Sequence, residues 1–143
     1  MSALSVQKTK LDGLVVVQPT VHGDARGFFL ETYHRDKYAE VGIDATFVQD
    51  NLSRSSKNIL RGLHYQIEQP QGKLVSVVHG AIFDVAVDLR KGSPTFGQWD
   101  GVMLSEENRY QLYVPVGFAH GFCVVSDTAE VTYKCTDLYI VCG

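Results

Sequence analysis

The sequence lacks a long hydrophobic run, which argues against a membrane-spanning helix and an N-terminal signal peptide. Its longest apolar run near the N-terminus, Leu14–Val17, is far shorter than the about 20 residues that cross a bilayer. Only three cysteines occur, Cys123, Cys135 and Cys142, and no two of them form a CxxC pair. A disulfide scaffold and a structural zinc site are therefore not expected, and a reducing cytoplasm fits best. We expect Cys123 and Cys135, which lie in apolar runs, to be small buried residues.

An excess of basic residues is also missing. The chain has 13 Lys and Arg against 16 Asp and Glu, which gives a formal net charge of −3 at pH 7. A general nucleic-acid-binding protein needs a cationic excess to displace counterions from phosphates, so this class is excluded. A small anionic ligand fits the composition, because one or two well-placed arginines are enough to bind it. With 45% hydrophobic and 20% charged residues, the chain is typical of one globular domain, expected over residues 1–143.

Neither GxGxxG nor GxxxxGK[ST] is present, so Rossmann and P-loop folds are excluded. Short runs rich in Val, Ile, Phe, Tyr and Thr alternate with Gly, Pro, Asn and Asp, a pattern that predicts strands and turns. One short helix is predicted over Asp36–Val41. Many closely spaced strands predict an all-β protein, either an antiparallel sandwich or a jelly-roll barrel. The predicted strands are Leu14–Gln18, Phe28–Tyr33, Thr46–Ser53, Ile59–Gln66, Leu74–His79, Ala81–Leu89, Gln98–Leu104, Tyr110–Pro115, Gly121–Ser126 and Glu130–Thr136.

Side-chain alternation divides the strand over residues 82–88 into two faces. Asp84 and Asp88 share one face, and we expect them to face water; lining a ligand-filled barrel interior is the alternative. The opposite face is predicted to be the core face and consists of Phe83, Val85 and Val87.

Polar side chains gather in four segments, and alternation predicts that Arg61 and His64 lie on opposite faces of their strand. Histidine can accept a proton near neutral pH, lysine can stabilise an oxyanion, tyrosine can return a proton, and arginine suits phosphate. Together they indicate proton abstraction next to a carbonyl group on a phosphorylated or nucleotide-linked substrate. The four segments are Gln49–Ser53, Leu60–Gln66, Gln71–Val75 and Pro115–Phe122.

The paired histidines of a jelly-roll metal site, HxH with a Glu and a later His, are missing. His64 stands alone, and Gln66 occupies the position of the second histidine. His120 could supply only one further ligand. We therefore expect no transition metal and no other cofactor.

Six segments, in order along the chain, closely resemble the dTDP-4-dehydrorhamnose 3,5-epimerase family, which comprises cupin-fold epimerases of the dTDP-L-rhamnose pathway. The resemblance extends from about Gly13 to Tyr139. It implies a metal-free cupin jelly roll that acts as a homodimer on a dTDP-4-keto-6-deoxy sugar. It also implies that an N-terminal strand pairs with the neighbouring subunit and that both subunits contribute to each site. The six segments are Gly23–Phe29, Phe47–Asn51, Leu60–Gln66, Gln71–Val75, Phe83–Arg90 and Pro115–Phe122.

By motif position, the resemblance implies His64 as the proton acceptor and Tyr133 as the proton donor. Lys73 matches the residue beside the keto oxygen of the sugar. Asp84 is implied as a supporting group inside the barrel. The implied ligand-contacting residues are Arg26, Glu31, Gln49, Asn51, Arg61 and His120.

The C-terminus departs from the family pattern, which continues past Tyr139 with a tail whose acidic residue orients the catalytic histidine. Here the sequence ends at Gly143, so we expect a shortened tail and weaker epimerase activity. Asp84 or Asp88 is the candidate replacement for the acidic partner. The alternatives are an epimerase that inverts only C3′ or only C5′, a metal-dependent oxygenase, and a non-catalytic protein that binds sugar nucleotides.

Overall fold

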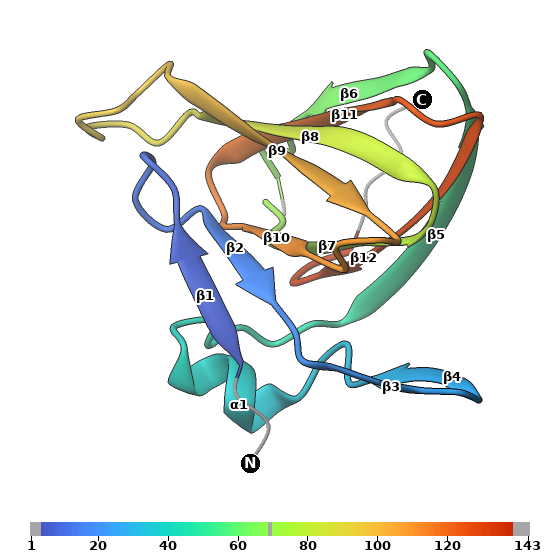
Figure 1. The fold of residues 1–143 in the computed structure, drawn as a ribbon. Coiled ribbons are helices and arrows are strands. Elements are labelled where there is room, and N and C mark those ends of the chain that lie inside the picture. Colours follow the sequence, from blue (N-terminus) through green and yellow to red (C-terminus); the bar gives the residue numbers. More distant parts are fainter. Residues whose placement is uncertain (1–3, 69, 139–143) are drawn as a thin grey trace.

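Two antiparallel sheets face each other and form a barrel (Figure 1). The computed structural model describes residues 4–68 and 70–138. The six-stranded sheet has the order β1-β2-β10-β7-β12-β5, and the four-stranded sheet has the order β6-β11-β8-β9. The first sheet contains β1 (Ser5–Lys8), β2 (Val15–Gln18), β10 (Gln111–Val114), β7 (Lys73–His79), β12 (Thr128–Cys135) and β5 (Gln49–Ser56). The second contains β6 (Leu60–His64), β11 (Phe118–Val124), β8 (Ala81–Asp88) and β9 (Trp99–Ser105).

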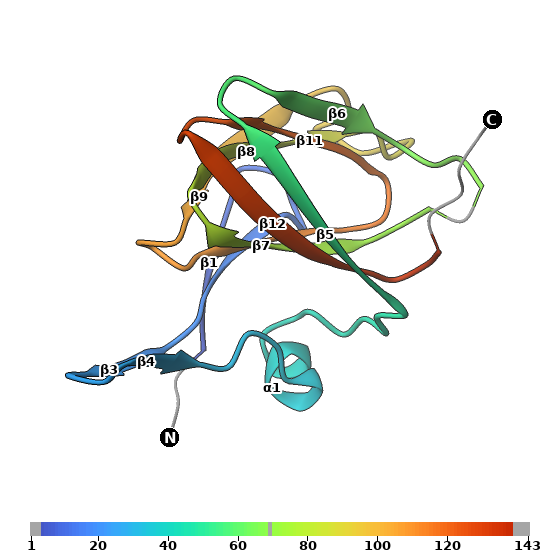
Figure 2. The same ribbon diagram turned by 90° about the vertical axis from the view of Figure 1, so that its right-hand side faces the viewer.

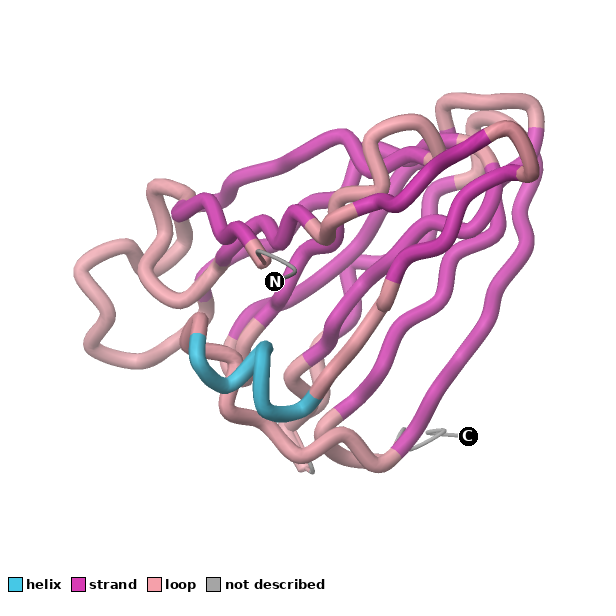
Figure 3. The backbone as a smooth tube through the Cα atoms, turned by 60° about the horizontal axis from the view of Figure 1, so that its bottom comes forward, coloured by secondary structure: helices cyan, strands magenta, loops and turns pink. Residues whose placement is uncertain are grey.

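A helix and a hairpin lie outside the barrel, on the side of the six-stranded sheet (Figures 1 and 2). The hairpin consists of β3 (Val21–Asp24) and β4 (Gly27–Leu30), and the helix is α1 (Arg35–Glu40). Figure 3 shows how strands dominate the chain. No helix in the described part of the chain is long and apolar enough to cross a membrane.

The predicted jelly-roll class is confirmed, and each of the ten predicted strands overlaps a strand of the structure. The predicted helix, Asp36–Val41, is shifted by one residue toward the C-terminus relative to α1. Two strands, β1 and β3, were not predicted. All four residues of β3 are exposed and β1 carries only one apolar residue, so neither shows the alternation of a half-buried strand.

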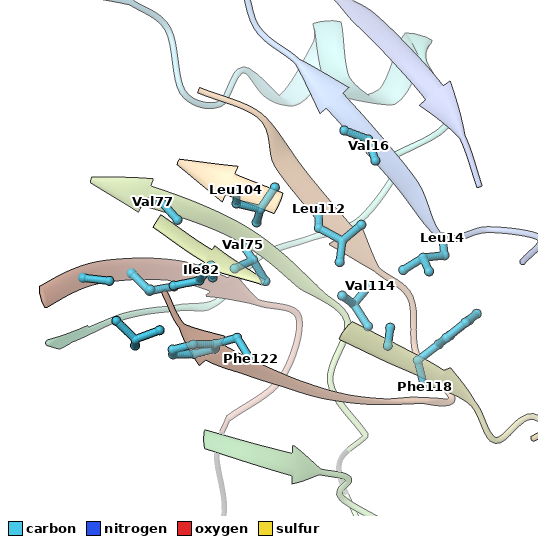
Figure 4. Packing of buried hydrophobic residues seen from close by; sticks show 14 of the residues in the cluster. Leu14, Val16, Val75, Val77, Ile82, Leu104, Leu112, Val114, Phe118 and Phe122 are labelled. Carbon is cyan, nitrogen blue, oxygen red and sulfur yellow. The ribbon is translucent and has the colours of Figure 1, made fainter. Parts of the chain in front are cut away.

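The space between the sheets is filled by apolar side chains from both of them (Figure 4). Val75, Leu112, Val124 and Val131 are completely buried there. Burying such a side chain contributes about 1.5–3 kcal/mol relative to leaving it exposed, so this cluster stabilises the barrel. Of the two described cysteines, Cys135 is buried as predicted and Cys123 is only partly buried; Cys142 lies outside the described residues.

Strand β8 presents to the interior the face that was predicted to be exposed. Asp84 and Asp88 are both 0% exposed. The predicted core face is instead the outer one, and its side chains are only half-buried. Both carboxylates tolerate burial because each has partners: Asp84 lies against His120, and Asp88 accepts a bidentate pair of hydrogen bonds from Arg90. The Arg90 guanidinium holds the pKa of Asp88 far below its usual range. The half-buried outer residues are Phe83, Val85 and Val87.

A β-bulge in β6 corrects the prediction for Arg61 and His64. His64 pairs with His120 and Arg61 pairs with Phe122, so three steps along β6 match two steps along β11. A bulge inserts one residue and shifts the alternation of side chains beyond it. Arg61 and His64 therefore lie on the same inward face, beside His120 and Phe122, and the prediction of opposite faces was wrong.

We expect Gly62→Ala to lower the free energy of unfolding by about 3 kcal/mol, because backbone strain and steric overlap add together. Gly62 lies in the bulge with a φ of 109°, and a Cβ there would lie 2.6 Å from the Gly121 Cα atom. The matched control is Gly97→Ala, where φ is 83° but the space is open; it should cost about 1 kcal/mol. Urea denaturation measures both values, and equal losses would show that the close approach costs nothing.

Candidate active site

At one end of the barrel, three neighbouring strands of the six-stranded sheet carry functional side chains on their inner faces. The strand register aligns Lys73 of β7 with Cys135 of β12 and Gln49 of β5. The next row holds Tyr133 and Asn51. The four-stranded sheet adds its inward residues from the opposite side. We call this group of residues the barrel mouth, and it consists of Gln49, Asn51, Arg61, His64, Lys73, Asp84, His120, Tyr133 and Cys135.

His64 ends strand β6 and lies across the ladder from His120. Its partial burial lowers the pKa of the imidazole, and the electrostatic influence of Lys73, His120 and Arg61 lowers it further. The side chain is therefore neutral at neutral pH, which is the form that accepts a proton. Within residues 4–68 and 70–138, no carboxylate forms a hydrogen bond to His64.

His120 and Asp84 form a buried pair, with 2.6 Å between Nε2 and Oδ1. The second carboxylate oxygen of Asp84 has no hydrogen-bond partner in the described part of the molecule. Asp84 thus holds the ring of His120, while Asp88 holds Arg90, Ser93 and Thr95. Neither candidate carboxylate supports His64 directly.

Lys73 is only 9% exposed and lies at the beginning of β7. Burial lowers the pKa of its ammonium group, and Cys135 and Asp84 partly oppose this shift. The Lys73 Nζ atom lies 5.6 Å from the centre of the Tyr133 ring. The mouth therefore holds a poorly solvated cation next to a phenol, a suitable place for a negatively charged oxygen.

Two residues were not predicted to belong to the site: Cys135, whose thiol lies in the barrel mouth, and Ser55, which lies beside it. Asn51 donates from Nδ2 to the Gln49 Oε1 atom at 3.4 Å and lies 3.6 Å from the Cys135 sulfur. The Arg61 Nε–H group donates to the Ser55 hydroxyl at 2.7 Å. A small polar residue has no motif of its own, but counting by twos along β5 from Gln49 would have placed Ser55 on the inner face.

The structure does not bring Arg26 and Glu31 to the barrel mouth. Arg26 lies in the turn between β3 and β4, with a side chain that is 91% exposed and paired with Asp24 at 2.7 Å. Glu31 forms an ion pair with Lys37 at 3.0 Å, beside the helix. The β3–β4 hairpin and α1 lie on the far side of the six-stranded sheet from β6 (Figure 2). In a single copy of the chain Arg26 and Glu31 are separated from His64.

Metal-ligating side chains do not cluster in the described part of the chain: no group of three or more His, Cys, Asp or Glu side chains could hold an ion. The fold and the site together define a cupin-like jelly roll whose mouth carries histidine, lysine and tyrosine side chains suited to proton transfer. The sequence model of dTDP-4-dehydrorhamnose 3,5-epimerase matches residues 8–141. The chain belongs to this family of isomerases.

Relatives with known names agree with this assignment. The dTDP-4-dehydrorhamnose 3,5-epimerase of Neisseria gonorrhoeae is 58% identical over 136 residues, which are 95% of this chain and 42% of that protein. The enzyme of the same name from Methanothermobacter thermautotrophicus is 56% identical over 132 residues, which are 92% of this chain and 71% of that protein. The chain thus spans less than half of the Neisseria relative.

A solved structure shares the fold closely. It is the crystal structure of dTDP-6-deoxy-D-glucose-3,5-epimerase from Legionella pneumophila in complex with dTDP-4-keto-L-rhamnose. The TM-score is 0.94 at 56% sequence identity, and the match covers 96% of this chain and 74% of that chain.

Proposed function

We propose that this protein inverts the configuration at C3′ and C5′ of dTDP-4-keto-6-deoxyglucose. The observation that carries the proposal is the convergence of His64, Lys73 and Tyr133 at the barrel mouth of a chain that belongs to an epimerase family. A neutral base, a buried cation and a phenol are the three groups that such a reaction requires.

The keto group at C4′ acidifies the hydrogens on C3′ and C5′, because the carbanion left behind delocalises into an enolate. His64 takes the proton from the carbon, and the electron pair moves onto the C4′ oxygen. The Lys73 ammonium group stabilises this oxygen. Tyr133 then donates its hydroxyl proton to the opposite face of the same carbon, and solvent restores both side chains. The reaction transfers protons only, so it requires no electron acceptor or donor.

The nucleotide supplies binding energy that positions the sugar. Arg61 presents a guanidinium for the diphosphate, since its planar donors suit phosphate oxygens. Gln49, Asn51 and His120 provide amide and imidazole groups of the barrel mouth that contact the substrate.

The test is to incubate the protein with dTDP-4-keto-6-deoxyglucose in D₂O and to follow C3′ and C5′ by NMR. Deuterium at both carbons, with conversion to the inverted sugar, supports the proposal. Exchange at one carbon would assign the chain to the single-centre epimerases. No exchange by a protein that binds dTDP would make it a non-catalytic binding protein.

We expect activity to persist below the ordinary histidine pKa of about 6.5, because His64 accepts protons only when neutral and its pKa is lowered. As the pH falls, kcat/KM should decline only when it passes through the lowered pKa. The measurement is the pH profile of kcat/KM, which reports the free enzyme. A decline centred at or above about 6.5 would contradict this assignment of the base.

We further propose that the protein acts as a homodimer in which the β3–β4 hairpin of each copy completes the site of the other. Phe28 and Phe29 on this hairpin are 56% and 71% exposed, and among the described strands those of the hairpin pair only with each other. A groove of about 600 Å³ lies between the hairpin and the outer face of the six-stranded sheet. Exposed apolar side chains beside a groove are typical of an interface. In such a dimer, Arg26 and Glu31 of one copy would reach the barrel mouth of the other copy, although they do not reach the mouth of their own.

Subunit mixing tests this arrangement. Arg26→Ala and His64→Ala homodimers should each be nearly inactive, because every site carries one of the lesions. In a mixed dimer, one site receives both lesions and the other receives none. Random exchange of subunits should therefore restore roughly a quarter of the wild-type activity. Activity that stays at the level of the separate variants would show that each site belongs to one chain.

A further inference from the structure

We infer that Ser55 is a positioning residue for Arg61, and that its hydroxyl group aims the guanidinium at the diphosphate of the bound nucleotide. This inference rests on the proposed function, in which Arg61 binds that diphosphate. It adds Ser55, which lies between two of the six segments on which the resemblance was based.

The hydrogen bond between Ser55 and Arg61 connects the two sheets of the barrel. Ser55 lies on the inner face of β5, the edge strand of the six-stranded sheet, and is 8% exposed. Arg61 lies on β6, the edge strand of the four-stranded sheet. These two edge strands do not pair with each other, yet the Arg61 Nε atom lies 2.7 Å from the Ser55 Oγ atom. The hydroxyl group therefore fixes an otherwise exposed side chain across the opening between the sheets.

The guanidinium group can bond to Ser55 through Nε and still bind a ligand through its terminal nitrogens. Arginine has five N–H donors in a plane, and the bond to Ser55 uses the one on Nε. No other hydrogen bond of Arg61 occurs within the described ranges, so the four donors of the terminal nitrogens stay available for a ligand. A free arginine side chain loses up to about 2 kcal/mol of conformational entropy when it is ordered. Holding Nε beforehand reduces that cost at the moment of binding.

The same strand provides a matched comparison in Ser53. This residue lies two positions earlier on the same inner face, and its hydroxyl oxygen is buried with no hydrogen-bond partner among the described residues. Ser53→Ala therefore removes a buried hydroxyl group that makes no hydrogen bond to Arg61. The two serines differ in their contact with Arg61, and that contact is what the experiment isolates.

The experiment measures the affinity for dTDP by isothermal titration calorimetry in a double-mutant cycle. Ser55→Ala should weaken dTDP binding about fivefold, the equivalent of one ordinary hydrogen bond. Ser55→Thr keeps the hydroxyl group and should restore most of the affinity. Ser53→Ala should bind dTDP like the wild type. In an Arg61→Lys background, which has no Nε–H group, Ser55→Ala should have no further effect.

Three outcomes overturn this inference alone. Wild-type affinity in Ser55→Ala would do so, as would an equal loss in the wild-type and Arg61→Lys backgrounds, or an equal loss in Ser53→Ala. Thermal unfolding of each variant shows whether it is folded at the temperature of the titration. A wild-type protein that does not bind dTDP overturns the proposed function, and this inference with it. A wild type that binds while Ser55→Ala is unaffected overturns this inference alone.

Discussion

The His64→Ala variant is expected to lose deuterium exchange at both C3′ and C5′ by about 10²–10⁴-fold, the range typical of a missing general base. His64 is the neutral imidazole at the barrel mouth, and the cations Lys73 and Arg61 help to keep it unprotonated. Because it acts on the sugar and not on the nucleotide, the affinity for dTDP should stay close to that of the wild type. NMR in D₂O measures the exchange, and calorimetry measures the affinity.

The control for this variant is His79→Ala. His79 ends β7 at the opposite end from Lys73, is exposed, and lies 3.4 Å from Glu106. Its removal should leave exchange at both carbons unchanged. If the His64→Ala variant keeps exchange at one carbon, a second base must serve that carbon, and the assignment of His64 to both centres is wrong.

The Lys73→Met variant is expected to lower kcat by about 10²–10³-fold, as the loss of one preorganised oxyanion-stabilising group does. Methionine fills a similar volume without the charge, so the enolate oxygen would lose its cation while the cavity stays filled. Burial already disfavours the charged form of Lys73. The free energy of unfolding should therefore stay the same or rise, and this separates a catalytic loss from a folding defect.

Lys91→Met is the matched control, because Lys91 is exposed in the loop after β8. It removes the same charge from the chain and should leave kcat unchanged. The two variants are compared by turnover and by urea denaturation. Full turnover in Lys73→Met would show that the oxyanion is stabilised by another group, and the mechanism would need a different cation.

The local pattern of side chains was sufficient to predict most of the fold. Runs rich in Val, Ile, Phe, Tyr and Thr, separated by Gly, Pro, Asn and Asp, predicted ten strands that all overlap strands of the structure. Strands β1 and β3 were missed because they bury almost nothing and so carry no such signal. The chemistry of the site was also predictable, because long motifs surround His64 and Lys73.

The sequence by itself determined the all-β class, the positions of most strands and the chemical types of the site residues, since these depend on local composition and spacing. Only the tertiary structure decided which face of β8 is buried and which residues of β6 share a face. Asp84 turns inward because His120, 36 positions away in the chain, can pair with it. Arg61 and His64 share a face because a bulge against β11 shifts the alternation between them. The link from Ser55 to Arg61 and the separation of Arg26 from the mouth likewise depend on how two sheets and a hairpin are arranged in space, which no local pattern encodes.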